Sequence, residues 1–380
     1  MKFIIKAAVL VAIFSACTGL DAPAGAEGFK AQFTDSTDGA FDMSRWLDSA
    51  YGFMPIVSII TEPAVGFGVS GGIIFIQRPR EDVGKPLTSP PSMYGAMGFY
   101  TENKTWGTGA FYKGHWRKDR IRYLAFGAYM SVNLTYYPPV LSEQGIGFDF
   151  NIEGGGFVQR CEFRLKDTNW FLGAEYSFFK NTVTFNLSDI IPDFDDYKID
   201  FRNGGLGPLA NYDSRDYTFT TNHGIYGHAG TTFYAPAFGA DEEFITGVVY
   251  GLGWLPVNPV VCGLRLDYRY SNGETPFYSK PFVKLRGIPA MRYQDKYTAV
   301  IETEERWKIT QRWAIDGFAG LGKAFGDDTS FSDAELVWSV GGGFRYKLAR
   351  VYNLFGGIDV ARGPEQWAVY IVVGQWWNGL

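Results

Sequence analysis

A period of two in side-chain character, repeated along most of the chain, is the feature that most constrains its fold. Between residues 262 and 270, Leu264 and Leu266 alternate with Arg265 and Asp267. The same period recurs in three other segments: 121–134, 159–165 and 336–348. Successive side chains of a β-strand point to opposite faces of a sheet, whereas a helix repeats about every 3.6 residues. The pattern therefore predicts many strands, each with one apolar face and one polar or small face.

Two all-β architectures fit this alternation: a soluble sheet and a membrane barrel. The segments are close to the roughly 9–11 residues of a tilted membrane strand, and their apolar faces end in Trp or Tyr, as aromatic girdles do. After residue 26, no run approaches the roughly 20 apolar residues of a spanning helix. The 47 Gly, 32 Phe, 23 Tyr and 11 Trp fit many twisted strands. We predict a transmembrane antiparallel β-barrel of about sixteen strands with an inward-folded loop. The last strand is expected over 366–378, and fourteen strands are the alternative.

Residues 1–26 have the pattern of a secretory signal peptide. Two lysines lead into an apolar run, and a small-residue cleavage site follows at 24–26. A lipoprotein signal with an acylated Cys17 is the alternative. We expect the exported chain in the bacterial outer membrane, with a short periplasmic segment at 27–52 and the barrel at 53–380.

Several function classes lack support in the sequence. The net charge of −5 gives no basic field for nucleic acid. The three histidines lack a metal-binding spacing, and two overlapping glycine motifs within 66–72 lie inside one expected strand rather than before a helix. We therefore expect neither an enzyme nor a bound cofactor or metal. Cys161 and Cys262 lie on distant strands, so we expect no disulfide between them.

The connection 273–294 carries the first set of candidate functional residues: Arg286, Gly287, Ile288 and Pro289. If this loop folds into the lumen, Arg286 needs a carboxylate partner, because an unpaired buried charge is costly. Glu304 lies on the following expected strand, on the same face as Glu302, and Asp316 lies on the next strand. We predict Glu304 and Asp316 as the partners. The loop is then either a latch that controls the lumen or the seam, or a structural plug.

A second polar cluster consists of Tyr212, Asp213, Arg215 and Asp216. It falls at the end of an expected strand, 203–217. Opposite charges this close together at a strand end predict a structural ion cluster, and a functional network is the alternative.

Four motifs resemble the Omp85 superfamily, specifically its bacterial surface antigen or BamA/TamA-type barrels. They are a mid-barrel Y-D-x-R-D signature at 212–216, a V-R-G-F/Y loop motif at 283–289, an E-x-R-aromatic strand at 304–307 and a closing strand from 363 to 377. The resemblance extends from about Asp42 to Trp377. Ile288 stands at the aromatic position of the loop motif, and Gly320 stands where the F-x-D-x-G strand of the family has its Asp. Asp316 is therefore the expected substitute for that acid.

The resemblance implies a non-enzymatic barrel that assists the insertion or translocation of proteins at the outer membrane. The implied mechanism is a weak seam between the first and last strands, where unpaired edge groups can pair with a client strand. The implied partners are outer-membrane lipid, client outer-membrane proteins and, because the soluble POTRA modules of the family do not fit ahead of the barrel, a separate periplasmic protein. A passive pore or lipid-handling channel and a structural surface antigen are the alternatives.

Overall fold

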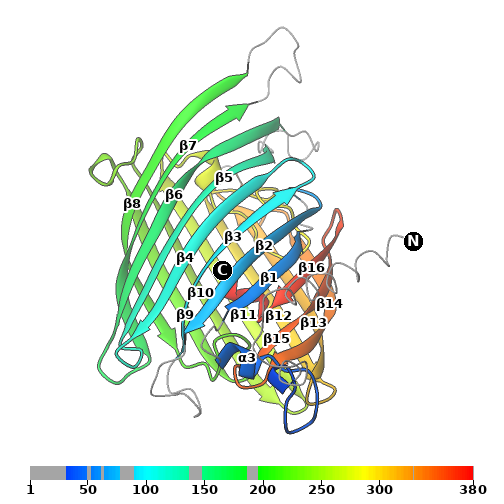
Figure 1. Ribbon diagram of the computed structural model, residues 1–380. Helices are drawn as coiled ribbons and strands as arrows, with labels where there is room; N and C mark the ends of the chain where they lie inside the picture. The colour runs from blue at the N-terminus through cyan, green and yellow to red at the C-terminus, as the bar shows by residue number, and fades with distance from the viewer. Residues whose placement is uncertain are drawn as a thin grey trace.

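Sixteen antiparallel strands, β1 to β16, form one sheet in sequence order, and the sheet curves into a barrel (Figure 1). This computed structural model describes residues 31–48, 53–60, 64–77, 90–136, 148–185, 196–327 and 329–379. It confirms the predicted all-β barrel of about sixteen strands. The predicted signal peptide, 1–26, and Cys17 lie outside the described residues. Among those described, no helix is long and apolar enough to cross a membrane.

The strands vary in length, and the longest lie in the first half of the sheet. The first eight are β1 Phe53–Ile60, β2 Gly68–Gln77, β3 Ser92–Thr101, β4 Trp106–Trp116, β5 Ile121–Tyr136, β6 Phe148–Arg164, β7 Trp170–Phe185 and β8 Tyr197–Asp213. The second eight are β9 Gly224–Tyr234, β10 Phe244–Val257, β11 Val260–Gly273, β12 Tyr297–Lys308, β13 Trp313–Phe325, β14 Val337–Ala349, β15 Leu354–Arg362 and β16 Trp367–Val373. Short helices are α3 Ser44–Asp48, η4 Pro236–Phe238, η5 Phe277–Ser279 and η6 Trp376–Gly379.

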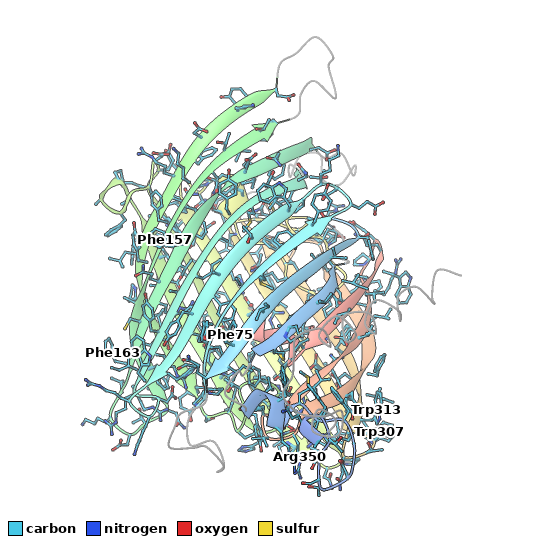
Figure 2. All side chains as sticks on the ribbon, in the orientation of Figure 1. Phe75, Phe157, Phe163, Trp307, Trp313 and Arg350 are labelled. Atoms are coloured by element: carbon cyan, nitrogen blue, oxygen red, sulfur yellow. The ribbon has the colours of Figure 1, made fainter. Side chains whose placement is uncertain are left out.

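The period of two sorts the side chains between the lumen and the outer surface. On β11, Leu264 and Leu266 are 46% and 52% exposed, whereas Arg265 and Asp267 are 0% and 4% exposed. Figure 2 labels several of the exposed aromatic side chains: Phe157, Phe163, Trp307 and Trp313. Apolar side chains outside and charged side chains inside are the arrangement of a membrane barrel rather than of a soluble sheet.

The first and last strands are not joined by a hydrogen-bonded ladder within the described residues. β1 and β16 come within 8 Å of each other between Cα atoms, but β16 pairs only with β15. The predicted last strand, 366–378, is wrong at its C-terminal end, because β16 stops at Val373. Gly374 then adopts a φ of 82°, a left-handed conformation that glycine accepts readily, and the chain leaves the sheet.

The C-terminal residues turn into the lumen instead of extending β16. Trp377 is 2% exposed and packs against Leu252, Trp254 and Val261. Its Nε1 donates a hydrogen bond to Glu302 Oε2 at 2.8 Å. The indole thus gains both an apolar environment and a hydrogen-bond acceptor, and a lipid-facing position would supply only the first. Figure 1 accordingly shows the chain end within the outline of the barrel.

Residues 31–48, which include α3, lie at the lower end of the barrel in Figure 1. Most turns at this end, such as 309–312, are shorter than most loops at the opposite end, such as 274–296. Outer-membrane barrels have short periplasmic turns and longer extracellular loops. We therefore assign the lower end to the periplasm.

The outward face of β11 predicts a depth-dependent effect of charge. Leu266 lies midway along β11, whereas Leu255 is exposed near the periplasmic end of β10. We expect Leu266→Arg to lower the free energy of unfolding in lipid vesicles by about 2–4 kcal/mol, and Leu255→Arg by about 0–1 kcal/mol. Denaturant unfolding of both variants measures the difference, and equal effects would show that this face does not contact lipid.

Candidate functional site

The connection between β11 and β12 folds into the barrel, as the sequence predicted. Val283, Leu285 and Ile288 are 1%, 5% and 4% exposed, and they pack with Val300 of β12 and Val337 of β14. This inner loop (residues 274–296) therefore has an apolar side that is pressed against the wall formed by β12 to β14.

Glycines on β13 allow this close approach. A Cβ atom at Gly320 would lie 2.5 Å from Leu285 Cδ2, and one at Gly322 would lie 2.6 Å from Val283 Cγ1. A Cβ atom at Gly320 or Gly322 would thus force the Leu285 or Val283 side chain out of its packed position.

Arg286 is fully buried at the tip of the inner loop, among three carboxylates. Its Nε and Nη2 donate to Glu302 Oε1 at 3.1 and 2.8 Å, and its Nη1 donates to Asp359 Oδ2 at 3.0 Å. Nη1 also lies 2.8 Å from Glu304 Oε2 in an ion pair that lacks hydrogen-bond geometry. The guanidinium stacks over Phe318, with Cζ 3.4 Å from the ring centroid. We call Arg286 with Glu302, Glu304 and Asp359 the arginine cage.

Two further arginines extend the cage along the wall. Arg265 of β11 donates to Glu302 Oε2 at 3.0 Å, and Arg345 of β14 donates to both oxygens of Asp359 at 2.5 and 2.9 Å. Asp316, which the sequence analysis paired with Arg286, instead lies 3.0 Å from Nε of Arg345. Phe318, two residues after Asp316 on the same face of β13, lies beneath Arg286. Asp359 of β15 supplies the additional carboxylate.

The loop tip is also tied to the last strand. The N–H of Gly287 donates to the Tyr370 hydroxyl of β16 at 2.8 Å, and the Ser339 hydroxyl donates to the carbonyl of Arg286 at 2.5 Å. Trp377 shares Glu302 with Arg286 through its own hydrogen bond. The cage therefore contacts β16 directly and the segment that follows β16. Pro289 follows in the same turn, where its carbonyl accepts a hydrogen bond from the N–H of Arg292.

Sequence reasoning missed Asp359, Tyr370 and Trp377. Asp359 is the one acid on β15, a strand whose inward face otherwise carries Phe355, Gly357 and Ala361. The sequence could have indicated Asp359, because a lone carboxylate on an otherwise apolar inward face needs a buried cation as its partner.

The residue cluster at the end of β8 forms a separate ion network. Asp213 accepts hydrogen bonds from Arg215 Nε at 2.8 Å and from Arg122 Nη1 at 2.9 Å. Asp216 Oδ1 accepts the backbone N–H groups of residues 217, 222 and 223, which orders the β8–β9 connection. Tyr212 packs edge-on against Trp170, with ring centroids 5.2 Å apart.

The N-terminal residues 31–48, here called the clasp, form ion pairs with two periplasmic turns. Arg312 of the β12–β13 turn lies 2.5 Å from Asp35 Oδ2, 2.7 Å from Asp38 Oδ2 and 2.6 Å from Asp42 Oδ2. Arg350 of the β14–β15 turn adds a 2.8 Å ion pair with Asp35. Figure 2 shows Arg350 at the lower end of the barrel, beside the clasp.

The same segment has an apolar side that touches both edges of the sheet. Leu47 of α3 is 1% exposed. It packs in one cluster with Met54 of β1 and Ile76 of β2, and with Tyr352 of the β14–β15 turn and Leu354 at the start of β15. The pairing of β16 with β15 ends at Gly356, so the clasp covers the periplasmic end of the seam where β16 does not reach.

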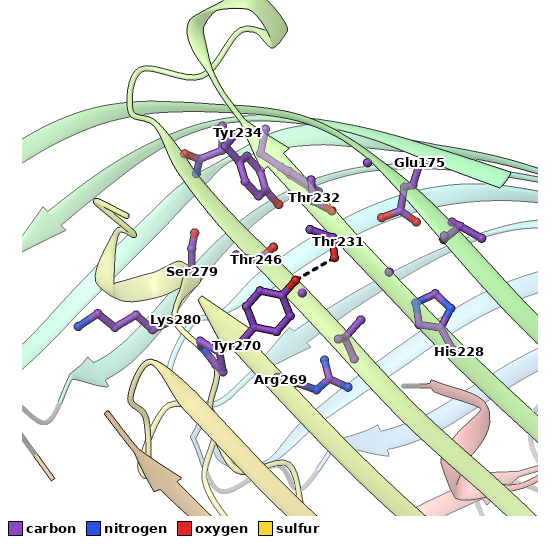
Figure 3. A pocket seen from close by; sticks show the side chains of 18 of the residues that line it. Glu175, His228, Thr231, Thr232, Tyr234, Thr246, Arg269, Tyr270, Ser279 and Lys280 are labelled. Carbon is purple, nitrogen blue, oxygen red and sulfur yellow. Dashed lines mark hydrogen bonds between the residues drawn. The ribbon is translucent and has the colours of Figure 1, made fainter. Parts of the chain in front are cut away.

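A cavity of about 440 Å³ lies in the lumen between β6 to β11 and the inner loop (Figure 3). Its charged and polar lining includes Arg160, Glu175, His228, Arg269, Lys280 and Lys284. Within the described residues, no group of three His, Cys, Asp or Glu side chains could hold a metal ion.

No protein-family model and no curated protein matches the sequence. Among solved structures, BamA from Haemophilus ducreyi lacking POTRA domains 1–3 matches with a TM-score of 0.56 at 12% identity, over 85% of this chain and 70% of that one. CdiB from Escherichia coli matches with a TM-score of 0.57 at 11% identity, over 84% and 62%. CdiB from Acinetobacter baumannii matches with a TM-score of 0.53 at 8% identity, over 84% and 59%.

This chain has the barrel fold of BamA and CdiB. At 8–12% identity this likeness is one of fold, and it does not single out one member. The chain spans less than two thirds of either CdiB chain.

The arginine cage predicts a large cost for removing its cation. Arg286→Met leaves the buried Glu304 without an ion-pair partner among the described residues, and it removes one of two arginines from both Glu302 and Asp359. We expect the free energy of unfolding to fall by about 3–5 kcal/mol. Arg292→Met is the matched control, because Arg292 lies in the same loop but pairs with the exposed Glu365. Its expected cost is about 1 kcal/mol or less. Denaturant unfolding in lipid vesicles compares the two, and similar costs would contradict a cage that depends on Arg286.

Proposed function

We propose that this chain is a non-enzymatic outer-membrane barrel that assists the insertion or translocation of proteins at the seam between β1 and β16. The observation that carries the proposal is the lack of a ladder between these adjacent strands in the described residues. An edge strand with unpaired N–H and C=O groups can pair with another chain. Strand addition of this kind supplies main-chain hydrogen bonds to an extended client segment.

In this proposal the arginine cage fixes the position of β16 at the seam. Tyr370 lies on β16 and bonds to the loop tip, while Trp377 beyond β16 bonds to Glu302 of the cage. The position of β16 therefore depends on the position of Arg286. A shift of the loop would move the last strand relative to β1 without unfolding the wall.

The clasp acts as a second restraint at the periplasmic end. Its contacts join β1 and β2 on one side of the seam to the β14–β15 turn on the other. The seam can therefore open at this end only after the clasp is released. A client or a periplasmic partner would have to displace it.

A solute channel is the second candidate function. The cavity in Figure 3 favours it, because charged and hydroxyl-bearing side chains line a space of about 440 Å³ within the lumen. The inner loop closes one side of that cavity and would act as its gate.

Photo-cross-linking tests the seam directly. A benzoyl-phenylalanine in place of Val57 on β1 is expected to capture newly made outer-membrane proteins in living cells. The matched control is the same replacement of Leu264 on β11, because both side chains are 46% exposed on the outer surface. Adducts at position 57 but not at 264 are the predicted result. Equal adducts at both positions would remove the seam from the proposal.

The charge contacts of the clasp predict release in acid. The hydrogen bonds from Arg312 and from the backbone N–H of Ala40 lower the pKa of Asp38 from 3.8 to about 2. A carboxylate with a lowered pKa stabilises the folded contact above its ordinary pKa, and this stabilisation is lost as the pH falls through the lowered value. We therefore expect the clasp to be fastened at neutral pH and to loosen as the pH falls from about 4 to about 2.

A nitroxide on Arg45→Cys, an exposed position of α3, measures this release by electron paramagnetic resonance on a chain whose other cysteines are replaced by alanine. Arg312→Gln is expected to make the label mobile already at neutral pH. Arg202→Gln is the control, because it breaks an exposed ion pair with Asp241 at the other end of the barrel. An immobile label in Arg312→Gln at neutral pH would rule out the clasp.

A further inference from the structure

Two neighbouring periplasmic turns carry exposed cationic side chains on residues whose backbone has a positive φ. They are the β4–β5 turn, 117–120, and the β6–β7 turn, 165–169. Arg117, Lys118 and Lys166 are exposed and have φ values of 54°, 56° and 50°. Side-chain-bearing residues rarely adopt this left-handed region, and yet four of the seven such residues in the described chain, with Asp119 as the fourth, lie in these two turns.

A buried carboxylate holds the first turn in this conformation. Asp119 is 3% exposed, and Arg122 donates to it from Nε at 2.8 Å and from Nη2 at 2.7 Å. Arg164 Nη2 donates to the same carboxylate at 2.6 Å, and His115 Nδ1 lies 2.8 Å away. Arg122 also stacks over Phe171, with Cζ 3.8 Å from the ring centroid. These contacts fix the backbone that presents Arg117 and Lys118 to solvent.

The cluster at the end of β8 extends this support. Asp213 bonds to the remaining nitrogen of Arg122 and to Arg215. The N–H of Asp213 also donates to the carbonyl of Asn169, in the β6–β7 turn, at 3.0 Å. The mid-barrel motif thus braces both turns from the next strand, which gives it a role that the proposed function does not use.

Three of the cations in these turns have no carboxylate partner in the described structure. The turns lie side by side, because the N–H of Arg164 donates to the carbonyl of Arg120 at 2.9 Å. Arg120 is neutralised by Asp167 at 2.7 Å. Arg117, Lys118 and Lys166 make no ion pair with any described residue, and they form what we call the basic patch.

Exposed apolar side chains adjoin the basic patch on the outer surface of the barrel. Trp116, Phe163, Leu165 and Trp170 are 42%, 55%, 43% and 48% exposed. Figure 2 shows Phe163 at the lower end of the outer surface. Aromatic residues collect at the headgroup level of a membrane, and lysine and arginine extend from there towards the phosphates.

We propose that the basic patch binds the phosphate groups of anionic phospholipids in the periplasmic leaflet. Charge complementarity and the adjoining lipid-facing belt favour a lipid over an acidic protein, because the cations lie directly at the edge of the surface that contacts lipid. The fixed backbone presents three charges together, so binding requires no further ordering of the main chain. The patch would anchor this side of the barrel and requires neither a client nor movement of the seam.

Native mass spectrometry of the full chain in detergent micelles tests the proposal. We expect tighter binding of dioleoylphosphatidylglycerol than of dioleoylphosphatidylcholine. The triple variant Arg117→Gln, Lys118→Gln, Lys166→Gln should lose about fivefold or more in affinity for the anionic lipid. The matched control, Lys104→Gln, Lys180→Gln, Lys198→Gln, removes the same charge from exposed positions at the opposite end and should retain the affinity.

Equal affinity of the native chain for the two lipids, or an equal loss in the control variant, would overturn the proposal. Binding of soluble polyglutamate without a preference for the anionic lipid would also overturn it and would point to an acidic protein. Asp119→Asn keeps all three cations but weakens their support, so it should bind the anionic lipid less tightly than the native chain. An unchanged affinity in that variant would overturn the role of the fixed backbone. Heat-modifiable gel mobility verifies that each variant is folded.

Discussion

A guanidinium buried inside the barrel sets the arrangement of the side chains around it. Arg286 has no exposed surface, and an unpaired charge in that position would cost more than most single contacts can offset. Carboxylates from β12 and β15 meet this need at the loop tip. Because β13 and β14 lie between those two strands, the cage joins parts of the wall across the lumen and so constrains its curvature there.

The state of the seam follows from this cage. Glu302 is shared by Arg286, Arg265 and Trp377, so one carboxylate links the inner loop, the wall and the residues that follow β16. Such a contiguous set of contacts is a physical route by which a loop shift reaches the last strand. The clasp restrains the same seam from the periplasmic end, with contacts that share no residue with the cage.

The strand pattern was predictable because successive side chains of a β-strand point to opposite faces, so the position of a residue in the strand tells which face its side chain occupies. The inward direction of Glu302 and Glu304 followed from that rule, and so did the need of Arg286 for a carboxylate. The rule says nothing about which of several inward carboxylates a loop tip will reach. Asp316 was therefore paired with the wrong arginine.

Other features depend on contacts that sequence spacing does not encode. Asp359 is 73 residues from Arg286, and no motif links the two. The early end of β16 depends on the packing of Trp377 inside the lumen. Alternation alone would place Trp377 in a continued strand. The role of Gly320 likewise appears only when Leu285 is seen above it.

In this mechanism the Arg286 cage holds β16 in its position beside β1. Double electron–electron resonance between nitroxides on Val57→Cys of β1 and Val369→Cys of β16, in lipid nanodiscs, tests it most directly. We expect one narrow distance distribution for the otherwise native barrel and for Arg292→Met, and an added longer distance for folded Arg286→Met. The same narrow distribution in all three proteins would contradict it.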